Sequence, residues 1–270
     1  MASLNVEWKS PPPASNQVLN LSHPMLIKLM FAWSADNPGR GLNGSRRLTL
    51  VGAASDVIGK NGIAKLFPGT SVGYVTSGPT SLPIGQWTMA VSMRCGSAWA
   101  IDSNAMGYCE APGDTTYDRQ IRRGTGDGHW GAYLHDGAVK IVTTGRILSL
   151  FEHANIVATT NGTVFNVYVN GGAPGSLAVA TSGYVSYTTP EFVIGYSSNA
   201  NAVTETKLVL MTEKFWTPAM AQAWIDNPWQ VFMPGKRTIF YDMTPAAGAF
   251  KAAWARGSNV IIQPGGRYAA

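Results

Sequence analysis

The segment from 156 to 172 constrains the fold most, because its pattern is that of a β-hairpin. Phe165, Val167 and Val169 alternate with polar residues, so an extended strand here would have one apolar face and one polar face. Asn161-Gly162 precedes this run, and both residue types accept the positive φ that a two-residue turn requires. The pattern predicts a hairpin, followed by a second turn at Asn170-Gly171-Gly172.

Period-two alternation also marks the segment from Trp87 to Cys95, and Thr217-Pro218 marks the start of a helix that ends at Asn227-Pro228. In the first segment, one face carries Trp87, Met89, Val91, Met93 and Cys95, and the other carries Thr88, Ala90, Ser92 and Arg94. We expect this strand to be central, with one face in the core. Further strands are predicted at 26–33, 46–50, 63–67, 72–75, 99–101, 117–121, 130–134, 139–142, 153–159, 191–197 and 205–211.

Composition favours many short strands in one domain. The 270 residues include 30 glycines and 16 prolines, and only 13% of residues are charged. Such a chain has many turns and few exposed helices, and all-β sandwiches commonly reach this length as one domain. An apolar content of 45% is enough to fill a core between two sheets.

Three short motifs, in this order, carry a family resemblance. They are Val-Tyr-Val-Asn-Gly at 167–171, Val-Ile-Gly-Tyr-Ser at 193–197 and Asn-Pro-Trp-Gln-Val-Phe at 227–232. They resemble the LamG-like, concanavalin A-like jelly roll, in the version common in virion proteins of tailed bacteriophages. The resemblance, from about Leu21 to Phe232, implies an all-β antiparallel sandwich with one short helix near 217–227. An up-and-down barrel is the alternative, and it would lack the terminal helix.

The chain departs from the family pattern at three positions. Met220 replaces a Glu that would complete a capping box, and Pro68 and Gly73 replace two family aspartates.

We expect three parts: an N-terminal arm over 1–24, the jelly roll over 25–232, and a basic C-terminal arm over 233–270. The first arm contains Pro11-Pro12-Pro13, a stiff extended stretch that is a spacer or a segment laid over a neighbour, with an ordinary disordered terminus as the alternative. In the second arm, one strand is expected within 233–241 and a short helix over 244–254. Either it contacts other subunits or it folds back on its own domain. Most of the net charge of +5 lies there, because Asp242 opposes Lys236, Arg237, Lys251, Arg256 and Arg267.

Charge and hydropathy bear on partners. The body before residue 234 is nearly neutral, so direct nucleic-acid binding is not expected. No apolar run approaches the roughly 20 residues that cross a bilayer, and the start lacks a signal-peptide pattern, so we expect neither membrane insertion nor Sec export. Cys95 and Cys109 are predicted to be reduced and buried, and a disulfide between them, if their strands are adjacent, is the alternative.

No catalytic residue is predicted. Retaining glycoside hydrolases of concanavalin A-like folds need two carboxylates on one strand face, and the 15 acids lack that alternate spacing. The four histidines lack zinc-site spacing. Several jelly rolls of this type bind Ca²⁺ through loop carboxylates, and Asp114 and Asp118 are the candidate ligands here, with solvated loop charges as the alternative.

Glycan binding is the remaining chemistry. Lectin sites combine an aromatic ring with hydrogen-bonding side chains, and the alternative for aromatic residues in a sandwich is a place in the core. The candidates are Trp99, Tyr108, Tyr117, Asp118, Arg119 and Trp130.

Two functions follow from the resemblance. The first is a non-enzymatic structural protein of a phage virion, a capsid decoration or tail-associated subunit. It would be assembled in the host bacterial cytoplasm, contact other virion proteins, form a homo-oligomer through its arms, and display a lectin-like jelly roll to surface glycans. The second is a carbohydrate-binding module whose main role is glycan recognition.

Overall fold

The computed structural model describes residues 17–43, 46–59, 62–68, 73–78, 85–95, 104–109, 117–123, 129–135, 138–149, 151–180, 190–195, 203–233, 238–242 and 251–255. The chain divides into two compact units. One is Glu7–Met233, and the other combines Met1–Val6 with Pro234–Ala270.

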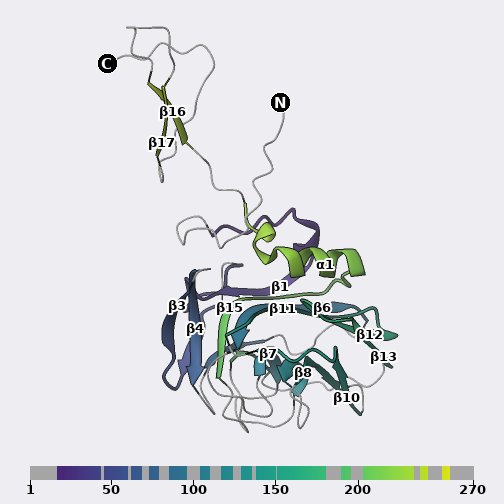
Figure 1. Cartoon of the computed structure of the whole chain (residues 1–270). Helices are drawn as coiled ribbons and strands as arrows, with labels where there is room; N and C mark the ends of the chain where they lie inside the picture. Colours follow the sequence, from purple (N-terminus) through teal and green to yellow (C-terminus); the bar gives the residue numbers. More distant parts are fainter. Residues whose placement is uncertain are drawn as a thin grey trace. The chain divides into compact units, whose positions relative to one another are not determined.

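Two antiparallel sheets lie face to face in the larger unit (Figure 1). The eight-stranded sheet contains, in spatial order, β13 (Gly175–Ala178), β12 (Val164–Val169), β11 (His153–Thr160), β6 (Trp87–Cys95), β15 (Val203–Thr212), β4 (Gly62–Pro68) and β3 (Ser55–Gly59), with β1 (Leu29–Ser34) also paired to β15. The seven-stranded sheet contains β10 (Val139–Thr143), β9 (Trp130–His135), β8 (Tyr117–Arg123), β7 (Asn104–Cys109), β14 (Glu191–Ile194), β5 (Gly73–Ser77) and β2 (Thr49–Val51). This is the predicted β-sandwich, consistent with a jelly roll.

The alternating segments form the strands that were predicted from them. On β6, the side chains of Trp87, Met89, Val91 and Met93 have no exposed surface and lie in the core between the sheets. In the β11–β12 hairpin, Gly162 has a φ of 95°, and the Asn161 side chain accepts a hydrogen bond from the backbone N–H of Val164 at 2.9 Å. The predicted hairpin is therefore present, but its turn is centred on Gly162 and Thr163, because the N–H of Asn161 donates to the carbonyl of Val164 at 3.4 Å and Asn161 does not take a positive φ.

The Val-Ile-Gly-Tyr-Ser motif has a packing explanation at its glycine. Gly195 has a φ of 71°, and a Cβ built on it would lie 2.0 Å from the ring of Phe67. Only a residue without a side chain fits this backbone and this contact.

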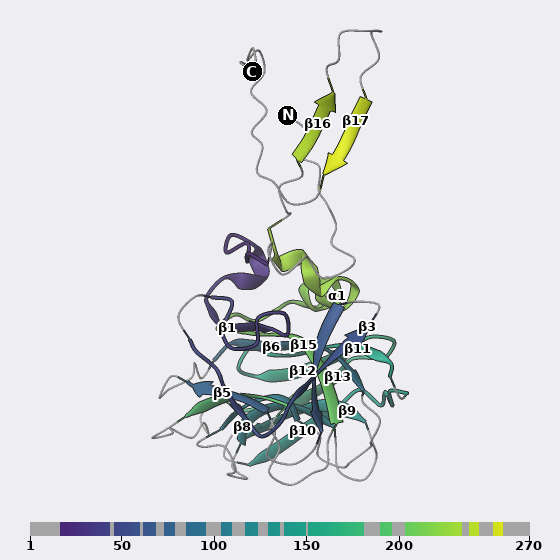
Figure 2. The ribbon, with the colours of Figure 1, turned by 90° about the vertical axis from the view of Figure 1, so that its left-hand side faces the viewer.

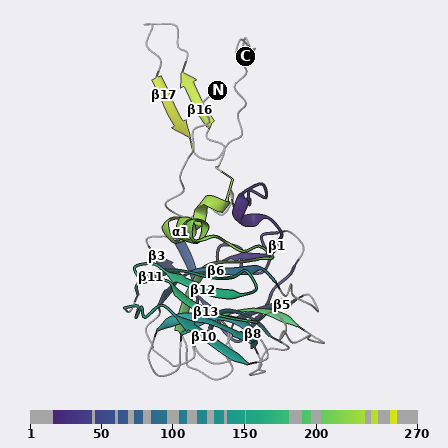
Figure 3. The same cartoon turned by 90° about the vertical axis from the view of Figure 1, so that its right-hand side faces the viewer.

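Helix α1 (Pro218–Asp226) covers the outer face of the eight-stranded sheet, while β5, β8 and β10 lie on the far side (Figures 2 and 3). Its predicted start is confirmed, because the Thr217 side chain accepts a hydrogen bond from the N–H of Met220 at 3.3 Å. Trp216 and Trp224 are fully buried between the helix and the sheet, with ring centroids 5.6 Å apart.

Several elements differ from the sequence prediction. Residues Pro24–Leu26 form the 3₁₀ helix η2 rather than the start of a strand, because Pro24 follows His23, whose Nδ1 caps the turn. Strands β3, β7 and β13 were not predicted. In β3 the apolar residue Ile58 is 84% exposed, so apolar and polar residues do not alternate with buried and exposed positions. The strand expected at 99–101 lies outside the described residues.

The terminal segments are also more structured than predicted where they are described. Leu19 is buried and forms a β-bridge with Phe232, and the N–H of Met233 donates to the carbonyl of Val18 at 2.7 Å. Residues 17–24 therefore pack within the larger unit. In the smaller unit, β16 (Thr238–Asp242) pairs with β17 (Lys251–Ala255), so residues 251–254 form a strand and not the expected helix. Within the described part of the chain, no helix has the length and apolar character to cross a membrane.

Candidate functional site

The outer face of the eight-stranded sheet changes from apolar to polar along its strands. Strand register places four rows of side chains across β11, β6 and β15 on this face. The rows are Thr159, Thr88 and Thr212; Val157, Ala90 and Leu210; Asn155, Ser92 and Leu208; and His153, Arg94 and Glu205. Helix α1 covers the first two rows, where the N–H of Trp216 donates to Thr88 and Thr159 at 3.1 and 3.0 Å. The polar rows lie beyond it.

A β-bulge adds a lysine to the polar end of this face. The pairing of β15 with β6 shifts between Thr206 and Leu208, which leaves Lys207 without a partner residue on β6. At the same point the other neighbour of β15 changes from β4 to β1. A bulge breaks the period of two and re-aims side chains. Lys207 and Leu208 are consequently both placed on the outer side of the sheet, beside Ser92.

The end of helix α1 forms the opposite wall. Asn227 ends α1 and also caps η4 (Pro228–Val231), because its side chain accepts from the N–H of Trp229 at 3.2 Å. Gln230 donates to the carbonyls of Ala223 and Asn227 at 2.6 and 2.9 Å. Asn155 Nδ2 donates to the carbonyl of Ile225 at 2.8 Å and so ties the sheet to the helix.

These elements enclose a polar pocket of about 170 Å³. Ser92 and Lys207 are buried and form its floor, whereas Asp226 is exposed and lies at its rim. The remaining side chains are half-buried apart from the buried Pro228 and Trp229. The lining residues are Ser92, His153, Asn155, Lys207, Asp226, Asn227, Pro228 and Trp229, and together they define what we call the outer-face pocket.

Lys207 is the most unusual group in the outer-face pocket. Lys207 is only 3% exposed, and its Nζ has no hydrogen-bond partner among the described residues. Burial lowers the pKa of Lys207 from 10.5 to about 8, and the positive charge of Arg94 acts in the same direction. Glu205 and Asp36 oppose this shift. Within the described part of the chain, this ammonium group therefore has no hydrogen-bond or ion-pair partner.

The neighbouring charges are already engaged. Arg94 forms an ion pair with Glu205 across β6 and β15, and its guanidinium lies over the ring of Phe151 at 5.2 Å. Burial lowers the pKa of His153, and Lys207 adds to the effect, so the imidazole is neutral at pH 7. Phe151 has a φ of 60° and is 51% exposed, which presents an aromatic ring to solvent beside these strands.

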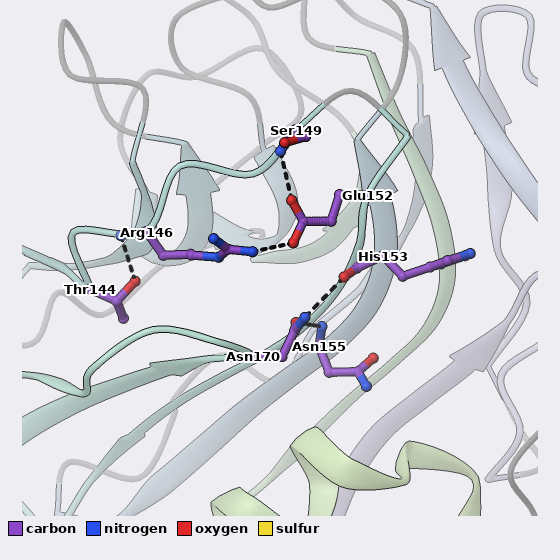
Figure 4. A network of polar contacts seen from close by, with 7 residues as sticks. All are labelled: Thr144, Arg146, Ser149, Glu152, His153, Asn155 and Asn170. Atoms are coloured by element: carbon purple, nitrogen blue, oxygen red, sulfur yellow. Dashed lines mark hydrogen bonds and ion pairs between the residues drawn. The ribbon is translucent and has the colours of Figure 1, made fainter.

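A second polar network holds the start of β11 in place (Figure 4). Asn170 accepts from the N–H of Asn155 at 2.7 Å and donates to the carbonyl of His153 at 3.1 Å. Glu152 pairs with Arg146 and accepts from the N–H of Ser149 at 2.8 Å. The Asn170 turn that the sequence predicts thus positions two residues of the outer-face pocket.

The structure corrects three of the predicted glycan contacts. Tyr108 and Trp130 lie in the core cluster at 1% and 2% exposure. Arg119 has no exposed surface, and its guanidinium lies 4.7 Å from the centroid of the Trp87 ring. These side chains point between the sheets, so they offer no surface to a sugar.

The other predicted site residues are not tested. Trp99 and Asp114 lie outside the described residues, as do the side chains of Tyr117 and Asp118 at the start of β8. Among the described residues, no group of three or more His, Cys, Asp or Glu side chains could hold a metal ion. Binding of Ca²⁺ at Asp114 and Asp118 stays a prediction.

Sequence reasoning did not find the outer-face pocket. Its members come from four separate segments, and each has an ordinary local context. The available signal was the polar face of the Trp87–Cys95 strand, which placed Ser92 and Arg94 opposite the core.

The fold and a sequence match define the class of protein. Residues 69–225, more than half of the chain, match the laminin G-type family described as the concanavalin A-like lectin/glucanases superfamily. The chain belongs to this superfamily. A search of curated proteins found no matching relative.

Solved structures share the fold at low sequence identity. Domain 4 of AbnA, a GH43 extracellular arabinanase from Geobacillus stearothermophilus solved in complex with arabinotriose, is 14% identical with a TM-score of 0.57, over 73% of this chain and 98% of that one. The binding domain of Paraclostridial mosquitocidal protein 1 is 12% identical with a TM-score of 0.56, over 73% and 52%. Trypanosoma rangeli sialidase is 16% identical with a TM-score of 0.55, over 78% of this chain and 36% of the sialidase. At these identities the likeness concerns the fold alone.

Proposed function

We propose that the larger unit is a non-enzymatic carbohydrate-binding domain and that the outer-face pocket is its ligand site. The observation that carries this proposal is a small polar pocket with oriented hydrogen-bonding groups on a concanavalin A-like sandwich. Sugar recognition relies on such groups, because each ring hydroxyl both donates and accepts. The arabinotriose in the similarly folded arabinanase domain supports the same ligand class.

The pocket has the size and the groups for one sugar unit. Its volume of about 170 Å³ is far above the roughly 10–15 Å³ that a single water needs by the same measure. Asn155 uses one amide N–H on Ile225, and Asn227 uses its Oδ1 on Trp229. Among the described residues, the second N–H and the Oδ1 of Asn155 and the amide N–H groups of Asn227 have no other partner, so they are available to a ligand.

The distribution of carboxylates supports binding without hydrolysis. Glycoside hydrolysis normally uses two carboxyl groups on either side of the scissile bond. Asp226 is the one acid among the residues that line the pocket, and it accepts a hydrogen bond from Gln222 at 2.8 Å. Glu205, on the adjoining row, is held by Arg94.

We also propose that the domain is displayed on a tailed-phage virion, as a capsid decoration or tail-associated subunit assembled in the host bacterial cytoplasm. The support is the resemblance carried by the motifs at 193–197 and 227–232. Val18, Leu21 and Met233 are about half exposed or more at the ends of the sandwich, which favours contact with another virion protein or a second copy there. The alternative is a carbohydrate-binding module that works away from a virion.

The ligand site is tested by a glycan array with the full chain, followed by calorimetry on each hit. Ser92→Leu fills the pocket floor and Asp226→Ala removes the rim acceptor, and we expect both to weaken binding. Lys140→Met, on β10 of the other sheet, is the control. Binding that survives Ser92→Leu but is lost in Trp99→Ala would move the site to the predicted loop aromatics.

Location is a separate question. Antibody labelling of purified particles in electron micrographs tests the virion proposal, and an absence of label on intact particles contradicts it.

A further inference from the structure

We propose that the outer-face pocket selects a sugar that carries a carboxylate, with Lys207 as the counter-charge on its floor. This inference rests on the proposed function and names its ligand class. It begins from the buried Nζ of Lys207, which has no hydrogen-bond partner among the described residues, and from the pocket that Lys207 lines.

A buried ammonium normally has an ion pair and hydrogen bonds, because desolvating an unpaired charge is costly. Among the described residues, no acid forms an ion pair with Lys207: Glu205 pairs with Arg94, while Asp226 accepts from Gln222 and Asp36 accepts from Gln17. The buried carboxylate of Glu205 is thus already paired with Arg94, whereas the ammonium of Lys207 has no carboxylate partner among the described residues. A carboxylate on the ligand would supply the missing charge and accept up to three N–H groups from Nζ.

The other charges favour a single carboxylate on a polyhydroxylated ring. The floor has one free cation among the described residues, while Asp226 at the rim adds a negative charge. A phosphate or sulfate cluster would be repelled by Asp226 and would leave charge unpaired. A sugar acid instead places its carboxylate on the floor and offers hydroxyls to the Asp226 carboxylate and to the amides of Asn155 and Asn227.

The groups that face Lys207 set the pH range of binding. They are Arg94 on β6, His153 on β11, Glu205 on β15, Asp36 after β1, and Asp226 at the end of α1. Lys207 is charged below its pKa of about 8, and sugar carboxylates are ionised well below neutrality. Binding of the acid is therefore strongest near neutral pH and falls as the pH rises through 8.

The test is calorimetry of the full chain with the methyl glycosides of glucuronic, galacturonic and N-acetylneuraminic acids, each against its methyl ester. A charge-assisted contact predicts that at least one acid binds about 10- to 100-fold tighter than its ester. Lys207→Met should remove this preference, and Lys140→Met should keep it. A second readout uses the wild type alone: the NMR titration midpoint of the Lys207 side chain should rise with the acid and stay unchanged with the ester.

The outcomes separate the two proposals. Equal binding of acid and ester, with no change in the Lys207 midpoint, overturns the inference and leaves the carbohydrate-binding proposal standing. An absence of binding by every sugar of a broad glycan array overturns both. Acetate that binds as tightly as the sugar acids also overturns the inference, since the site would then recognise a bare anion.

Discussion

Replacing Lys207 by Met should stabilise the domain and at the same time impair ligand binding. The pKa of Lys207 falls from 10.5 to about 8 on burial, and each pH unit corresponds to about 1.4 kcal/mol, so the buried charge costs about 3 kcal/mol near pH 7. Met keeps the length of the stem and removes the charge. We expect a gain of about 1–3 kcal/mol, which is a rise of roughly 3–10 °C in the melting temperature of a domain of this size.

The stability gained by Lys207→Met should shrink as the pH rises. Between pH 8 and 10.5 the unfolded chain holds the Lys207 proton that the folded chain has released, so wild-type stability rises with pH in this window. The advantage of Lys207→Met is therefore largest below pH 8 and disappears by about pH 10.5. Calorimetric melting of both proteins between pH 6 and 10.5, with Lys140→Met as the control, measures this difference. A variant that is less stable than wild type at every pH would refute the reasoning.

Three further predictions follow from the structure. Thr88→Val should lower stability by about 1–3 kcal/mol in urea unfolding, because the hydroxyl accepts from Trp216 N–H and donates to the Lys214 carbonyl; an unchanged midpoint would contradict this. Gly195→Ala should cost roughly 2–4 kcal/mol, since it combines a φ of 71° with a clash against Phe67, and a soluble variant with wild-type stability would count against the packing described here. Any sugar acid that binds should lose affinity between pH 7 and 9.5 in wild type, whereas a neutral sugar should not; parallel profiles would exclude Lys207 as the charged partner.

Much of the fold was predictable because its signals are local. Alternation identifies the faces of β6 and β12, and turn chemistry identifies the hairpin at Gly162. Thr217-Pro218 identifies the start of α1 in the same way. Strand β3 was missed because its exposed Ile58 breaks the pattern, and because a short edge strand gains its structure from its neighbour rather than from its own sequence.

The candidate site was not predictable, because its key residue depends on strand pairing. Residues 203–212 look like one regular strand, and the bulge at Lys207 exists only in the register with β6. Two of the aromatic residues proposed from sequence are buried in the core for a related reason. Tyr108 and Trp130 lie on strands of the seven-stranded sheet, and the face that each side chain occupies is set by pairing and burial.

The most direct test of the proposal that the outer-face pocket binds carbohydrate is to locate a bound sugar on the domain. A backbone NMR titration of the full chain with a sugar identified on the array should shift the amides of Ser92, His153, Asn155, Lys207 and Asn227 together, and leave β8 and β9 unchanged. Shifts confined to the seven-stranded sheet or to the loop around Trp99, with the outer-face pocket unaffected, would contradict it.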